Sequence, residues 1–103
     1  MGKYFNQADV FPVIADSIRK IHQRKGDFVS HEEIVEALLE DPVGKELVET
    51  AHQKQNSQSR EWLASNMVAW FSQRMTEGKS EYASEFVRKM IGNDWAYKPT
   101  GDA

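Results

Sequence analysis

Four segments of the chain carry apolar residues at three- and four-residue spacing, and each is bounded by residues that begin or end helices. Such spacing places the apolar side chains on one face of a helix, so the pattern restricts the chain to a mostly helical fold. The first segment runs from about residue 8 to 24 and stops before Gly26. We expect Asp9 to cap it, which would place Pro12 in the first turn, where a proline costs no hydrogen bond. Its buried face would consist of Val10, Phe11, Ile14, Ile18 and Ile21.

Local capping signals define the next two helices. Ser30 followed by Glu33 is a capping box, in which each side chain accepts a hydrogen bond from the other residue's backbone N–H, and it predicts a helix over 31–40. An Asp-Pro pair at 41–42 then supplies an N-cap and a favourable first helical residue, so a third helix is expected over 42–53.

The entirely polar run at 53–59 predicts a loop, and a fourth helix follows over 60–76 with Ser59 as N-cap and Gly78 as its stop. Two faces can be assigned to this helix from a period of 3.6 residues. The face expected to be buried contains Leu63, Ala64, Met67, Val68, Trp70, Phe71 and Met75. The face expected to be exposed contains Glu61, Trp62, Ser65, Asn66, Ala69, Ser72 and Gln73.

The segment from 81 to 98 admits two interpretations. Tyr82, Phe86 and Met90 are four residues apart, which is typical of a helix over 81–91. A period of two instead indicates two strands around a Gly-Asn turn, and a β-hairpin over 85–98. We favour the hairpin because it would give a short strand at 28–29 a pairing partner.

These elements predict an α+β, mostly helical fold with about four helices, the short strand 28–29 and the hairpin 85–98. With 103 residues and ordinary globular composition, we expect a single domain over 8–98, with a flexible N-terminus at 1–7 and a flexible tail at 99–103. The chain has no cysteine, no secretory leader and no apolar run long enough for a membrane span, so we expect a cytoplasmic protein that has no membrane contact.

The order of these elements resembles the winged helix-turn-helix superfamily. The segment 26–34 (GDFVSHEEI) is similar to the first strand and second helix of many such domains. The segment 86–97 resembles the wing of HARE-type helix-turn-helix modules, in which an aromatic-x-Arg strand precedes a glycine and a closing aromatic strand. The chain differs from a minimal winged helix by the additional helix and loop that begin at residue 42.

The resemblance implies a non-enzymatic domain that binds double-stranded DNA in a regulatory or nucleic-acid-processing protein, with helix 60–76 in the major groove. The residues implied near base edges are Ser57, Gln58, Arg60, Ser65 and Asn66. Those implied at phosphates are Lys79, Arg88, Lys89 and Lys98. The formal net charge is −3, but residues 52–92 carry six basic and four acidic side chains, which permits one polyanion-facing side.

A second hypothesis concerns Trp62, which lies on the polar face of helix 60–76. Together with Ala69 and Gln73 it could contact a partner protein, since tryptophan is enriched in interfaces. Alternatively, the loop 53–59 or the helix 42–53 could pack over its ring.

Nothing in the sequence indicates catalysis, a metal, a cofactor or a small-molecule substrate. The chain has no glycine-rich phosphate loop, nucleophile elbow or Cys-His pair. His22, His31 and His52 lack the spacing of known ligand sets, and the carboxylates of 32–40 form a charged stripe.

Overall fold

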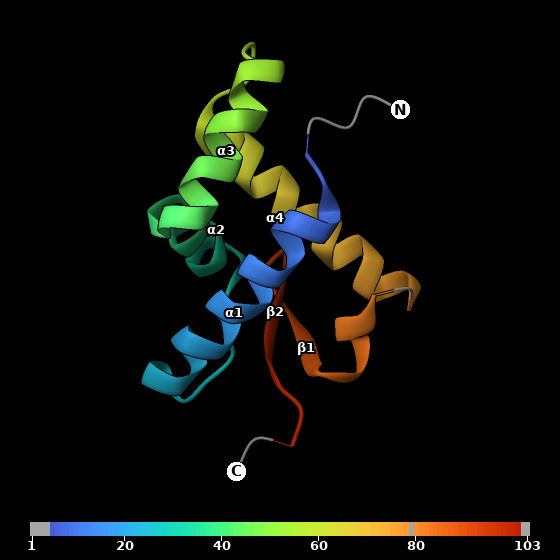
Figure 1. Ribbon diagram of the computed structural model, residues 1–103. Coiled ribbons are helices and arrows are strands. Elements are labelled where there is room, and N and C mark those ends of the chain that lie inside the picture. Colours follow the sequence, from blue (N-terminus) through green and yellow to red (C-terminus); the bar gives the residue numbers. More distant parts are fainter. Residues whose placement is uncertain (1–4, 79, 102–103) are drawn as a thin grey trace.

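Four helices and a C-terminal hairpin make up the protein, in a computed structural model that describes residues 5–78 and 80–101 (Figure 1). The α+β, mostly helical prediction is therefore confirmed. In Figure 1, α3 and the hairpin lie at opposite ends of the molecule, and α4 extends from the end of α3 to the start of the hairpin. The elements are α1 (Gln7–Lys25), α2 (His31–Glu40), α3 (Pro42–Lys54), α4 (Arg60–Glu77), the short 3-10 helix η1 (Glu81–Ser84), β1 (Phe86–Ile91) and β2 (Asp94–Pro99).

The cap of α1 differs from the prediction. Asn6, not Asp9, caps the helix, and its side chain accepts a hydrogen bond from the N–H of Ala8 at 2.9 Å. Asparagine is as good an N-cap as aspartate, so the helix starts earlier and Pro12 lies in its second turn. Both Ala8 and Pro12 are exposed, so water can satisfy the Ala8 carbonyl that proline cannot bond.

The caps of the other helices agree with the sequence. The reciprocal capping box of Ser30 and Glu33 is present at the start of α2. The Asp41 side chain accepts from Gly44 N–H at 2.9 Å, and Ser59 caps α4. These contacts span two or three residues, which is why a sequence pattern can predict them.

The predicted hairpin is confirmed. Strands β1 and β2 are antiparallel, with Arg88 opposite Tyr97 and Ile91 opposite Asp94. Gly92 has φ 64 and is the first of two loop residues, as expected for a type II′ turn. Helical geometry within 81–91 is limited to the 3-10 turn η1.

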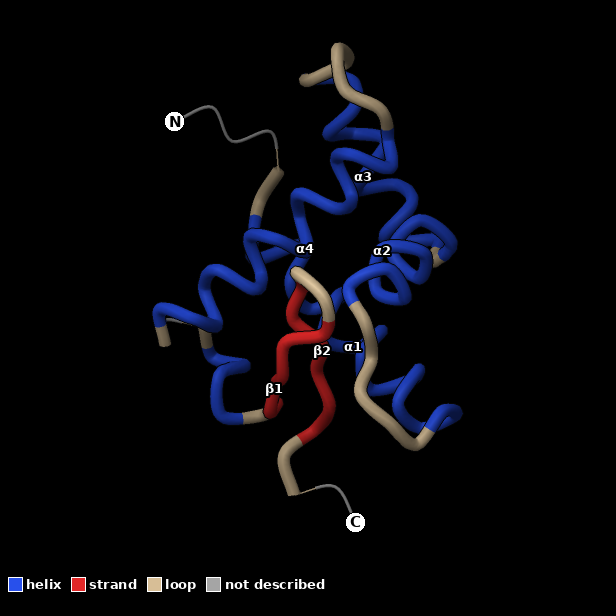
Figure 2. Tube along the Cα trace, turned by 180° about the vertical axis from the view of Figure 1, so that it is seen from behind, coloured by secondary structure: helices blue, strands red, loops and turns tan. Residues whose placement is uncertain are grey.

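The predicted strand at 28–29 is present as a single bridge to β2. Val29 N–H donates to the carbonyl of Tyr97 at 2.7 Å, and Tyr97 N–H donates to the carbonyl of Val29 at 3.0 Å. Figure 2 shows this segment, just before α2, running beside β2. The bridge attaches the hairpin to the helices.

Phe71 of α4 lies in the centre of the core, where four aromatic rings from α1, η1, β1 and β2 surround it. Its ring centroid is 5.4 Å from that of Phe11, 5.9 Å from Tyr82, 6.5 Å from Phe86 and 5.6 Å from Tyr97. The predicted inner face of α4 is buried except for Trp70, which is half-buried.

The predicted flexible ends, 1–7 and 99–103, fall partly on residues 1–4 and 102–103, which lie outside the described residues. In the described part, α1 already begins at Gln7 and β2 reaches Pro99. No helix among the described residues is both long and apolar enough to cross a membrane.

Gly44 provides a test of the packing between α2 and α3. A Cβ atom at this position would lie 2.3 Å from the backbone oxygen of Leu38. We expect Gly44→Ala to lower the free energy of unfolding by about 1–3 kcal/mol, because the backbone of α2 would have to move. Urea denaturation would measure the change.

Thr50→Ala is the matched control, since Thr50 is exposed on the same helix. It should leave stability unchanged or raise it by a few tenths of a kcal/mol through helix propensity. Equal stability of Gly44→Ala and the wild type would contradict the close approach of the two helices.

Candidate nucleic-acid interface

The N-terminus of α4 was expected to offer Ser57, Gln58 and Arg60 to a nucleic acid. Ser57 is exposed and Gln58 is half-buried. Arg60 donates two hydrogen bonds to the carboxylate of Glu49 on α3, one of them 3.1 Å long from Nη2 to Oε1. This pairing lowers the pKa of Glu49, so the charge of Arg60 is locally neutralised at neutral pH.

Further along α4, Ser65 and Asn66 are half-buried instead of fully displayed. Ser65 Oγ lies within hydrogen-bond distance of His31 Nε2, at 2.9 Å, so it links α4 to α2. The exposed side chains of this face are those of Glu61 and of Trp62, Ala69 and Gln73, the last three being the residues of the protein-contact hypothesis.

Arg88 lies on the side of the hairpin that faces α4. Its Nη1 donates to Thr76 Oγ1 at 2.5 Å, and its guanidinium carbon is 4.0 Å from the centroid of the Trp95 ring. These contacts, one with α4 and one with β2, restrict the movement of the guanidinium group. The groups that it contacts in this way are a hydroxyl group and an aromatic ring, which leave its positive charge unneutralised.

Lys89 and Lys98 lie on the opposite side of the hairpin. Side chains alternate along a strand, and the register pairs Lys89 with Ala96 and Lys98 with Val87, so both lysines share one face. Their Nζ atoms are 4.8 and 5.1 Å from the centroid of the Phe28 ring. Phe28 is thus the residue that gathers these two cations.

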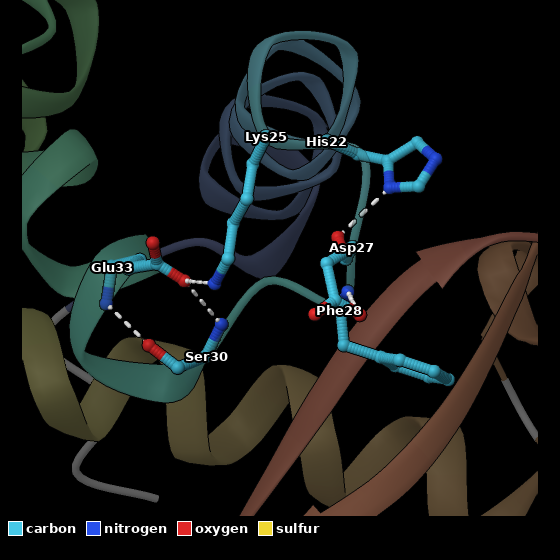
Figure 3. A network of polar contacts seen from close by, with 6 residues as sticks. All are labelled: His22, Lys25, Asp27, Phe28, Ser30 and Glu33. Carbon is cyan, nitrogen blue, oxygen red and sulfur yellow. Dashed lines mark hydrogen bonds and ion pairs between the residues drawn. The ribbon is translucent and has the colours of Figure 1, made fainter.

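The loop between α1 and α2 holds Phe28 in place through short polar contacts (Figure 3). His22 Nδ1 lies 2.9 Å from the carbonyl oxygen of Asp27, and the Asp27 carboxylate accepts from Phe28 N–H at 2.7 Å. On the other side of the loop, Glu33 accepts from Lys25 Nζ at 2.7 Å and from the N–H of Ser30 at 2.9 Å.

Ion pairing separates the cations of the hairpin from many others of the described chain. Five described cations lie within 4.0 Å of a carboxylate, whereas Arg88, Lys89 and Lys98 have no such contact with a described residue. The paired cations are Arg19, Lys20, Lys25, Arg60 and Arg74. The hairpin therefore carries three cations that form no ion pair with a carboxylate of the described residues.

The nine residues implied as a DNA site do not form one patch. Three lie at or before the start of α4, two are half-buried further along α4, three occupy the two sides of the hairpin, and Lys79 lies outside the described residues. A shallow groove of about 310 Å³ lies between α4 and the hairpin turn. Ala69, Gln73 and Thr76 line one side of it, and residues 93–95 line the other.

Phe28, Trp95, Thr76 and His31 were not among the candidate residues, although each contacts one of them. In the sequence, the only signal that could have predicted Lys89 and Lys98 on one face is the alternation of side chains along the two strands.

Within the described residues, no group of three or more acidic or histidine side chains is arranged to hold a metal ion. No protein-family model, curated protein or solved structure matches the chain.

The Arg60–Glu49 pair can be tested by removing its acid. If the start of α4 contacts a nucleic acid, Glu49→Gln should release the guanidinium there, so that duplex DNA binds more tightly at low salt and the salt dependence steepens by about one unit. Fluorescence anisotropy at several salt concentrations would measure both effects.

Glu46→Gln is the control, because Glu46 is an exposed acid of the same helix with the same charge change. If both substitutions have the same effect, only net charge matters, and the pairing of Arg60 does not limit binding.

Proposed function

We propose that this protein is a DNA-binding domain of the winged-helix type, in which the hairpin acts as the wing and contacts phosphates. The observation that carries this proposal is the group Arg88, Lys89 and Lys98, which has no carboxylate partner among the described residues. Cations held beside aromatic rings remain free to replace the counterions of a phosphate backbone.

The arrangement of the elements supports the same proposal. Val29 pairs with β2, β2 pairs with β1, and α4 directly precedes η1 and the hairpin, which is the order expected for a wing beside a recognition helix. The groove between α4 and the hairpin turn places both elements on one side of the molecule.

The two elements would contribute differently to binding. Both arginines of α4 are paired with acids, Arg60 with Glu49 and Arg74 with Glu77. Affinity would therefore depend mainly on phosphate contacts of the hairpin, and sequence discrimination through α4 would be modest. Such binding is strongly salt-dependent.

An anisotropy titration of random-sequence duplex DNA at increasing salt tests the proposal. Lys89→Ala and Lys98→Ala should each weaken binding and reduce the salt slope by about one unit, because each removes one phosphate contact. Lys45→Ala, which removes an exposed cation from α3, is the control and should leave the slope unchanged. Absence of binding at low salt would exclude DNA as the ligand.

The exposure of Trp62 favours a second candidate function, a protein-interaction module. This residue is 44% exposed, so neither α3 nor the loop before α4 covers it completely. Ala69 and Gln73 are exposed on the same helix. A solvent-exposed tryptophan on a face without an unpaired cation suits a protein better than a polyanion.

Immobilised wild-type and variant proteins would separate the two functions. Trp62→Ala should abolish capture of a specific partner from a cell extract, because an anchoring tryptophan typically contributes about 2 kcal/mol or more to an interface. Val43→Ala, which truncates an apolar side chain of α3 that is 56% exposed, should not affect capture. Equal capture by all three proteins would argue against the Trp62 surface.

A further inference from the structure

The tip of the hairpin exposes apolar side chains. All six residues from 89 to 94 are exposed, and Met90 and Ile91 are 50% and 48% accessible. Of the five exposed large apolar side chains among the described residues, three lie on β1: Val87, Met90 and Ile91. A single exposed apolar residue is ordinary, but two adjacent ones at the end of a hairpin form a small apolar patch.

This apolar patch lies on a thin, wedge-shaped end of the hairpin. Met90 lies opposite Trp95 and Ile91 opposite Asp94, next to the two-residue loop. Because neighbouring side chains alternate, Met90 and Ile91 extend from opposite faces of the ribbon. Each face of the ribbon end therefore carries one apolar side chain of β1, with Asp94 beside Ile91 on one of the faces. The end is only two strands wide, about 5 Å between strand axes.

Positively charged side chains lie next to the wedge, on the side away from the hairpin loop. Arg88 and Lys89 precede Met90 in the chain, and Lys98 shares a face with Lys89. Thr76 and Trp95 hold Arg88, so that its charge has a defined position relative to the tip. Asp94 is the only acid of the two strands and lies at the tip itself, which disfavours phosphate contacts there and leaves them to the cations further back.

We propose that the hairpin tip inserts Met90 and Ile91 between base pairs from the minor groove and bends the duplex. This inference rests on the proposed DNA-binding function and adds an activity to it. Apolar wedges of this kind unstack a base step, and flanking cations bind the phosphates that converge on the bend. The lack of unpaired cations on α4 fits a domain that deforms DNA with its hairpin.

A duplex of about 25 base pairs, labelled at both ends with a fluorescence-transfer pair, tests the bend, since wedge insertion kinks DNA by about 20–90°. Wild-type protein should raise the transfer efficiency, and more so on a duplex with a central TA step, which unstacks easily. A 2-aminopurine beside that step should brighten as stacking is lost.

The variant Met90→Ser/Ile91→Ser should still bind with an unchanged salt slope, but it should neither raise transfer nor brighten 2-aminopurine. Val87→Ser is the matched control, because Val87 is exposed on β1 away from the tip, and it should bend DNA as the wild type does. Since all three side chains are exposed, unfolding curves of the variants should coincide with that of the wild type.

The outcomes separate the inference from the function on which it rests. Salt-dependent binding without bending by the wild-type protein overturns the wedge and leaves the DNA-binding function intact. No binding at low salt overturns the function, and the wedge with it. Sedimentation with phosphatidylcholine–phosphatidylserine vesicles that depends on Met90 and Ile91, without DNA bending, assigns the tip to a lipid surface and overturns the wedge.

Discussion

Tyr97 holds the two parts of this molecule together. Its backbone exchanges two hydrogen bonds with Val29, its ring packs edge-on against Phe71, and its hydroxyl donates to Ser72 Oγ at 2.7 Å. Burial raises the pKa of Tyr97, so this donor stays protonated over the ordinary pH range. A lone two-stranded hairpin is marginal in water. By joining the hairpin to α4 and to the segment before α2, Tyr97 helps to fix the position of Arg88, which lies directly opposite it.

The same attachment determines the charge of the surface. With Val29 bonded to β2, the preceding residue Phe28 lies beside Lys89 and Lys98, and the contacts of Asp27 and His22 fix the loop that carries it. These cations thus neighbour an aromatic ring instead of a carboxylate. An aromatic ring attracts an ammonium group by about 0.5–1 kcal/mol at an exposed site, enough to orient it without neutralising it. A polyanion can therefore still compete for the charge.

Local interactions could be predicted from the sequence, and contacts between distant segments could not. The capping box of Ser30 and Glu33 and the stop at Gly78 depend on neighbouring residues, and the structure has them. The hairpin was the better of two interpretations only because it offered Val29 a partner. The cap of α1 was predicted at Asp9, whereas Asn6, three residues earlier, accepts the capping hydrogen bond.

The candidate site also combines local features that the sequence determines with contacts between distant segments that it does not determine. The sequence alone determined which residues carry charge, which helix face is apolar, and that Lys89 and Lys98 would share a face if a hairpin formed, since helix and strand periodicity are local properties. Only the tertiary structure decided which charges stay available. Arg60 is neutralised by an acid on another helix, and Ser65 is engaged by His31. Pairing depends on distances between elements far apart in the chain, and no spacing pattern encodes those distances.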